Sequence, residues 1–296
     1  MNISWIADYD FLANLAGGAE MSDREAYMHG MKSGHTMQLY IPESARMFAP
    51  GPTDLSIISN AARFDLNWIV NTVCAKPYIF YAHDYFPLCR YRLFYPMLEK
   101  CKKCMNLDSA KKIALNSALN IFLSPLHFDA WCYAIPELKD RPHHIHPSPV
   151  NLELFKPRSE VKRNPNAGLV INAAAFKGAK NTVEYCAKHP EITFTFCGGQ
   201  PEAQLPPNCT FVGYVPTLSM PSMFNQASYY VELPDTIQPF NRTVLEARLM
   251  EVPHIVINKN IGAASYDWFK EDTASIRKRI AEAVPNLWKK IEETVK

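Results

Sequence analysis

Short apolar runs alternate along the first half of the chain with stretches that have the spacing of helices. Five of these runs have the length of buried strands and cover residues 3–7, 37–41, 55–59, 78–82 and 119–123. Apolar strands separated by helices are typical of a mostly parallel sheet that is covered on both faces. The pattern therefore predicts an α/β domain with its ligand-binding loops at one edge of the sheet.

The alternation stops at residues 147–166 and then restarts. This segment carries four prolines and several charges with little periodicity, which predicts a linker. Beyond it, apolar runs predict further strands at residues 168–173, 192–197, 210–212, 229–233 and 254–258. Helices are expected at about residues 180–188, 220–226 and 242–250.

The chain therefore divides into three expected parts. Two are Rossmann-like, doubly wound domains over residues 1–155 and 156–268, and the third is a helical tail over residues 269–296. We expect the tail helix to be interrupted at Pro285 and to pack back towards the N-terminal domain. Two such domains joined by a hinge make a cleft, and clefts between domains are common ligand sites.

The segment LAGGAE, residues 15–20, follows the first predicted strand and opens the first predicted helix. Gly17 and Gly18 let the backbone approach a ligand closely, and a helix N-terminus favours anionic groups such as phosphate. Ser22 and Glu25 have the spacing of a capping box at the start of this helix. Since glycine pairs in such turns are more often structural than functional, this segment alone assigns no function.

Two segments of the second half carry stronger candidates for phosphate binding. Lys177 stands in a loop between a predicted strand and helix, where it can act as a point charge on a diphosphate. Arg242 and Thr243 open a helix, where backbone amides, a guanidinium and a hydroxyl form a phosphate cradle. Glu246, about one turn further, can accept both hydroxyls of a ribose. The alternative for each segment is an ordinary solvated loop or helix face.

Taken in order, these segments resemble the retaining glycosyltransferases of family 4, which have the GT-B fold. LAGGAE resembles the glycine loop of that family, and FKGAKN, residues 176–181, resembles its lysine–glycine phosphate loop. IQPFNRTVLEA, residues 237–247, resembles the family's E-x7-E motif in the variant EPFGR-T/V-V-x-EA. The resemblance is good over residues 168–268 and patchier over residues 1–150, which retain the glycine loop, YAHDYF and FLSPLH.

The resemblance implies particular roles for residues of both domains. Nucleotide-sugar binding falls on Gly17, Gly18, Lys177, Gly213, Tyr214, Phe240, Asn241, Arg242, Thr243 and Glu246. Within this set, the lysine and the arginine would neutralise the diphosphate, the glutamate would hold the ribose, and Gly213 and Tyr214 would meet the nucleobase. Catalytic roles beside the sugar and the acceptor fall on His83, Asp84 and Gln238.

The implied reaction moves a hexosyl or pentosyl group from a nucleotide-diphosphate sugar, with UDP- or GDP-sugar expected, to an acceptor hydroxyl of a glycan or another molecule. The resemblance implies retention of the anomeric configuration, and it implies no required cofactor and no catalytic metal. Closure of the two domains would expel water and limit hydrolysis of the donor.

Two positions depart from the family pattern. Gln238 stands where the family has its first glutamate, and its amide lacks the negative charge that would support an oxocarbenium-like transition state. Asn241 stands where the family has glycine, and asparagine tolerates left-handed backbone geometry better than most residues. Gln238 motivates one alternative function, a non-catalytic relative that binds a nucleotide sugar or a glycan.

The charge and composition of the chain indicate mainly where in the cell the protein is expected to occur. The chain has 31 Lys+Arg and 29 Asp+Glu, and its net charge of +2 excludes a strongly basic nucleic-acid coat protein. No apolar run approaches the roughly 20 residues of a membrane-spanning helix, and the N-terminus lacks the layout of a signal peptide. We therefore expect a cytoplasmic protein whose eight cysteines are thiols or metal ligands.

A basic segment with three cysteines follows the fourth predicted strand. Cys101 and Cys104 have C-x2-C spacing and form, with Cys89, a candidate structural zinc site, for which the alternative is three reduced thiols. From Arg90 to Lys112 there are seven Lys/Arg residues among aromatic residues. Because basic and aromatic side chains suit an anionic acceptor, a glycosyltransferase that acts on modified bases in DNA is a second alternative function. A solvated basic face is the simpler interpretation of this run.

Overall fold

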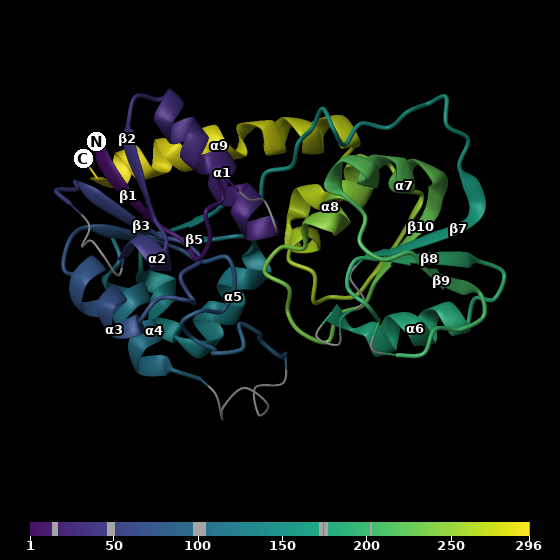
Figure 1. Ribbon diagram of the computed structural model, residues 1–296, viewed down its shortest axis with the longest axis horizontal. Coiled ribbons are helices and arrows are strands. Elements are labelled where there is room, and N and C mark those ends of the chain that lie inside the picture. The colour runs from purple at the N-terminus through teal and green to yellow at the C-terminus, as the bar shows by residue number, and fades with distance from the viewer. Residues whose placement is uncertain are drawn as a thin grey trace. The chain divides into compact units, whose positions relative to one another are not determined.

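The computed structural model describes residues 1–13, 17–45, 51–96, 105–171, 174, 177–201 and 203–295. The chain divides into two compact units (Figure 1). Unit 1 comprises Met1–Pro149 with Ile280–Lys296, and unit 2 comprises Val150–Arg279. Each unit contains a parallel sheet with helices on both faces, as the apolar runs predict.

Unit 1 contains a six-stranded sheet in the order β2-β1-β3-β4-β5-β6. Its strands are β1 (Asn2–Ile6), β2 (Thr36–Tyr40), β3 (Leu55–Ile58), β4 (Tyr78–Tyr81), β5 (Leu119–Phe122) and β6 (His143–Ile145). Its helices include α1 (Gly18–Lys32), α2 (Pro42–Ala45), α3 (Leu66–Trp68), α4 (Leu107–Asn116), α5 (Pro125–Ala134) and the last part of α9 (Thr273–Val295). Helices α1 and α9 lie over one face of the sheet, and α3, α4 and α5 lie over the other (Figure 1).

Helix α1 begins directly at the glycine pair. Gly17 is its N-cap residue, with extended backbone and no capping side chain. The capping-box interpretation of Ser22 and Glu25 is therefore wrong, because Ser22 lies inside the helix and its hydroxyl donates to the Gly18 carbonyl at 2.9 Å. The prediction that the glycine pair opens the first helix is confirmed.

Helix α9 continues through Pro285 without the predicted interruption. The proline removes one backbone hydrogen bond, and buried side chains before it, such as Ile280, and after it, such as Leu287 and Trp288, hold the helix in place. The Trp288 indole donates to the Ala26 carbonyl at 2.7 Å, and a Cβ at Gly30 would lie 2.3 Å from the indole ring. Neither α9 nor any other helix in the described part of the chain has the length and apolarity needed to cross a membrane.

Unit 2 contains a five-stranded parallel sheet in the order β11-β10-β7-β8-β9. Its strands are β7 (Asn164–Ile171), β8 (Thr193–Cys197), β9 (Cys209–Phe211), β10 (Ala227–Glu232) and β11 (His254–Ile257). Helix α6 (Ala179–Ala187) lies over one face, and α7 (Met220–Gln226) and α8 (Arg242–Leu249) lie over the other (Figure 1). Strand β7 begins inside the predicted linker, because Asn164 pairs with Ala227 at the start of β10.

The start of α6 approaches the end of β10 closely at the carboxyl edge of this sheet. Gly178, the N-cap residue of α6, has a φ of +74°, and a Cβ there would lie 1.9 Å from the Leu233 carbonyl oxygen. The Asn181 side chain donates to the same carbonyl at 3.2 Å. Glycine at position 178 therefore allows the start of α6 to pack against the end of β10.

Candidate functional site

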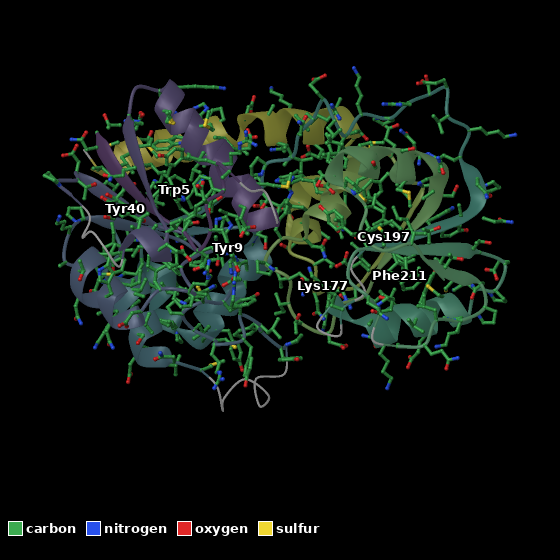
Figure 2. The ribbon with its side chains drawn as sticks, in the orientation of Figure 1. Trp5, Tyr9, Tyr40, Lys177, Cys197 and Phe211 are labelled. Atoms are coloured by element: carbon green, nitrogen blue, oxygen red, sulfur yellow. The ribbon has the colours of Figure 1, made fainter. Side chains whose placement is uncertain are left out.

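Lys177 lies at the carboxyl edge of the unit 2 sheet (Figure 2) and joins two other segments there. Its ammonium donates to Gln238 Oε1 at 2.5 Å and lies 4.0 Å from Glu232 Oε1. The lysine precedes α6, the glutamate ends β10, and the glutamine lies in the loop between β10 and α8. The fold thus brings an ammonium, a carboxylate and an amide together from three separate parts of the sequence.

Glu232 is the centre of this cluster, although no sequence motif pointed to it. Its side chain is buried, with Oε1 accepting from Asn241 Nδ2 at 2.5 Å and Oε2 accepting from the Tyr230 hydroxyl. The Thr243 hydroxyl donates in turn to Asn241 Oδ1 at 2.8 Å. Burial and the adjacent carboxylate raise the pKa of Tyr230 well above its ordinary value, so the phenol stays a donor. The available signal was a glutamate at the end of an otherwise apolar strand.

The turn before α8 has a left-handed backbone at its N-cap residue. Asn241 is the N-cap residue and has a φ of 71° and a ψ of 83°, in the left-handed region. The expectation that asparagine tolerates this geometry is confirmed. Because its side chain bonds to Glu232, the asparagine also ties the start of α8 to the end of β10.

Arg242 and Glu246 form a buried ion pair on the first turn of α8. Arg242 Nη2 lies 3.6 Å from Glu246 Oε1, and the two side chains are 11% and 8% exposed. Arg242 Nη1 is also buried and has no hydrogen-bond partner among the described residues. Burial raises the pKa of Glu246, and the neighbouring guanidinium opposes that shift. An anionic ligand at this helix start would find one guanidinium N–H group still unsatisfied.

Gln238 is held firmly on both its backbone and its side chain. The backbone N–H donates to the Asn260 carbonyl at 2.8 Å, and the backbone carbonyl accepts from the Gly262 N–H at 3.0 Å. Its Nε2 donates to Thr236 Oγ1 at 2.7 Å, which directs Oε1 towards Lys177. Because residue 238 is an amide, the lysine has one carboxylate neighbour here instead of two, and less negative charge offsets its ammonium within the site.

The other predicted donor residues of unit 2 occupy two different environments. Phe240 is buried and packs against Tyr266, with ring centroids 6.2 Å apart, so its side chain anchors the loop. Gly213 and Tyr214 follow β9, at the same edge of the sheet as Lys177. The Gly213 carbonyl accepts from the Gly198 N–H at 2.8 Å, and the Tyr214 side chain is 77% exposed. That exposed ring is available to a planar ligand.

In unit 1, the candidate residues His83 and Asp84 follow β4. His83 Nε2 lies 2.9 Å from Asp23 Oδ1, and both side chains are 2% exposed. Asp84 Oδ2 accepts from Arg92 Nε at 2.5 Å. Gly17 lies beside Glu20, whose Oε2 would be 2.5 Å from a Cβ at the glycine. The two catalytic candidates are therefore both held by charged or ionisable partners.

Arg92 lies at the centre of a second cluster that sequence reasoning missed. The backbone of Arg92 has a φ of 60°, which is unusual for a residue with a long side chain. Its guanidinium donates to Asn60 Oδ1 at 2.6 Å and lies 3.7 Å from Asp8 Oδ2. Burial raises the pKa of Asp8 to about 6. Asp84 and Asp8 offset the positive charge of Arg92. This arginine therefore contributes little to any basic surface that could attract an anionic acceptor.

The candidate zinc site falls largely outside the described residues. Cys101, Cys104 and the two lysines between them lie there, whereas Cys89 is buried and its strand-like segment forms an isolated bridge to Met105. Within the described ranges, no three His, Cys, Asp or Glu side chains cluster as metal ligands do. Zinc binding by these three cysteines stays a prediction.

Comparison with known proteins identifies the architecture. No family model matches the sequence, and no curated protein matches it. Sucrose-phosphate synthase from Thermosynechococcus elongatus matches with a TM-score of 0.66 and 15% identity over 99% of this chain and 94% of that chain. Anabaena HepE in complex with UDP matches with a TM-score of 0.62 and 13% identity over 97% and 91%. The chain has the GT-B fold.

A third GT-B structure, the lipopolysaccharide outer core galactosyltransferase WaaB, covers both chains almost completely. Its TM-score is 0.58 at 12% identity, over 99% of this chain and 99% of that chain. At such identities the likeness establishes the GT-B fold and leaves substrates open. HepE has been solved with UDP and with UDP-glucose, so it binds a nucleotide sugar. None of these structures supports DNA as an acceptor.

Proposed function

We propose that this chain is a retaining glycosyltransferase that moves a hexosyl or pentosyl group from a UDP- or GDP-sugar to an acceptor hydroxyl. The observation that carries the proposal is at the carboxyl edge of unit 2, where Glu232 joins Lys177 to Asn241, the N-cap residue of α8, and Arg242 follows as the first residue of that helix. Cationic side chains at a helix start on this edge favour a phosphate ligand. The GT-B fold and the nucleotide complexes of HepE support the same function.

The diphosphate is proposed to lie between the lysine and the arginine. A buried donor without a partner costs about 1–3 kcal/mol, so a phosphate oxygen at Arg242 Nη1 would remove an existing penalty as well as add a charge-assisted bond. Lys177 would contribute a second positive charge on the departing diphosphate. Stabilising this leaving group is the main catalytic contribution that unit 2 offers.

The nucleoside is proposed to extend from the first turn of α8. Glu246 in its ionised form has two oxygens for the two ribose hydroxyls, and the Arg242 guanidinium at 3.6 Å favours that form against the effect of burial. Gly213 and Tyr214 would meet the base, through backbone groups and through the exposed aromatic ring.

The transfer step is proposed to replace one bond at the anomeric carbon with another on the same face. The bond from that carbon to the diphosphate oxygen breaks, the acceptor oxygen forms the new bond, and the acceptor proton passes to the departing diphosphate. Gln238 offers an amide oxygen and no carboxylate for a covalent sugar ester, which favours this direct replacement. His83 and Asp84 of unit 1 are proposed to contact the sugar and the acceptor.

A screen of nucleotide sugars tests the proposal on the full chain. UDP-glucose, UDP-galactose, UDP-N-acetylglucosamine, UDP-xylose and GDP-mannose would be compared by thermal stabilisation, and then by release of nucleoside diphosphate in the presence of sugar acceptors. We expect one donor to add about 2.7 kcal/mol to the free energy of unfolding at a hundredfold excess over its Kd. The same donor should turn over, and NMR of the product should show the donor's anomeric configuration.

Two glutamate variants test donor binding, and the pattern of binding and turnover distinguishes a glycosyltransferase from a non-catalytic relative. Glu246→Gln should lose most of the stabilisation by the donor, whereas Glu184→Gln, at a side chain that is 55% exposed on α6, should keep it. Tight binding of a donor without turnover on any acceptor would favour the non-catalytic relative suggested by Gln238. Stabilisation by none of the donors would contradict nucleotide-sugar binding altogether.

A further inference from the structure

A buried carboxylate–histidine pair lies in unit 1, at the junction of α1 with the ends of β3 and β4. Asp23 Oδ1 lies 2.9 Å from His83 Nε2, and the Ser59 hydroxyl lies 2.6 and 2.7 Å from the two carboxylate oxygens. All three residues are buried. Asp23 lies a little more than one turn from Gly18, to which nucleotide-sugar binding is assigned by resemblance.

The hydrogen bonds of this trio favour one tautomer of the histidine ring. The Ser59 hydroxyl donates to both oxygens of Asp23, and a carboxylate oxygen that faces His83 Nε2 favours a hydrogen on that nitrogen. His83 therefore carries its proton on Nε2, since the bond made by one ring nitrogen determines which nitrogen is protonated. The remaining nitrogen, Nδ1, is then a hydrogen-bond acceptor in the neutral ring.

The second ring nitrogen of His83, Nδ1, takes no part in the hydrogen bonds of this trio. It is buried and has no hydrogen-bond partner among the described residues. The ring lies against Tyr81, with centroids 4.2 Å apart, and Tyr81 lies 5.8 Å from His146. Burial lowers the pKa of His146 to about 3, so this neighbour is neutral. A buried acceptor without a partner costs about 1–3 kcal/mol, which a hydroxyl donor would recover.

We propose that Asp23, supported by Ser59, is a positioning residue that fixes the His83 ring with its proton on Nε2 and thereby keeps Nδ1 as the acceptor for a sugar hydroxyl of the nucleotide-sugar donor. The inference rests on the proposed glycosyltransferase function and adds to it a residue that neither the sequence motifs nor the comparisons assign. Asp23 itself need not touch the substrate, because it acts through the histidine.

NMR of the full chain labelled with ¹⁵N-histidine tests the proposal without any turnover. The His83 signals would be assigned by their loss in His83→Gln. We expect a protonated Nε2 whose hydrogen exchanges slowly with water, and an unprotonated Nδ1 that shifts when the nucleotide sugar is added but not when UDP or GDP is added alone. A proton on Nδ1, or an Nδ1 signal that ignores the sugar, would overturn the proposal.

Variants separate positioning from a merely structural role. In Asp23→Ala the slow exchange of the Nε2 hydrogen and the sugar-induced shift of Nδ1 should both be lost. Asp8→Asn is the matched control, because Asp8 is also a buried carboxylate of unit 1 but pairs with Arg92 instead of His83, and it should leave the His83 signals unchanged. His83 signals that stay as in the wild type in Asp23→Ala would overturn the assignment to Asp23.

Kinetics provide the second readout. We expect Asp23→Ala to lower kcat by about 10- to 100-fold, as loss of a residue that orients a functional histidine typically does, with the Kd for UDP or GDP unchanged within about twofold. Asp23→Asn, which keeps an oxygen for the Nε2 hydrogen, should recover part of the loss. An unchanged kcat in Asp23→Ala contradicts the proposal. A wild-type chain that turns over no donor refutes the glycosyltransferase function instead, and the ring state measured by NMR still decides the role of Asp23.

Discussion

Replacement of Lys177 by methionine is expected to lower kcat/KM for the nucleotide sugar by about 10²- to 10³-fold, the usual cost of removing one group that stabilises a leaving oxyanion. Methionine keeps the apolar stem of the lysine and removes its charge. The lost ammonium now bonds to Gln238 Oε1 at 2.5 Å and lies 4.0 Å from Glu232, so it is held in place before any ligand arrives. Initial rates of nucleoside diphosphate release would measure the effect.

The control for this variant is another lysine of the same unit. Lys180→Met removes a charge three residues further on, from a side chain that is 82% exposed and lies 4.0 Å from Glu184. We expect its kcat/KM to stay within about twofold of the wild type, since exposed ion pairs contribute little. Equal rates for Lys177→Met and the wild type would remove the lysine from the donor site.

Replacement of Gly178 by alanine is expected to destabilise the protein by about 2–5 kcal/mol, the sum of a left-handed backbone and a steric overlap. The φ of this residue is +74°, and the added Cβ would lie 1.9 Å from the Leu233 carbonyl oxygen. The contact is with backbone at the end of β10, so it cannot be relieved by a change of rotamer. Unfolding in urea, followed by circular dichroism, would measure the loss.

Gly34→Ala separates the two causes. Gly34 has a similar φ of +86°, but a Cβ there has no atom within 4 Å. It should therefore cost only the backbone term, about 1–2 kcal/mol. If both variants lost the same stability, the close approach of α6 to β10 would be incorrect, and with it the placement of Lys177.

Among the elements of the fold, the strands could be predicted most accurately from the sequence. The strands β1 to β5 of unit 1 were predicted to within a residue, because these short apolar runs are bounded sharply by helices and polar loops, whereas β6, which begins with two histidines, was not predicted. The start of β7 at Asn164 was missed because its first residues are polar and exposed, and only pairing with β10 makes them a strand.

The remaining errors arise where tertiary contacts override local rules. Pro285 predicts a break, but α9 is held on both sides of the proline by buried side chains such as Ile280 and Trp288. Ser22 has the spacing of a cap, yet its hydroxyl is used inside the helix. Local sequence also gave no reason to link Glu232 with Asn241 or Asp23 with His83, because these contacts join distant segments.

Direct titration with nucleoside diphosphates tests the central claim, that the carboxyl edge of unit 2 binds the diphosphate of an activated sugar. UDP and GDP would be titrated calorimetrically into the wild type and into Arg242→Ala. We predict saturable binding of one nucleotide per chain, weakened at least about tenfold in the variant, since a hydrogen bond to a charged group contributes about 1.5–3 kcal/mol. Absence of saturable binding by either nucleotide at millimolar concentration, or equal affinity for the wild type and Arg242→Ala, would contradict the claim.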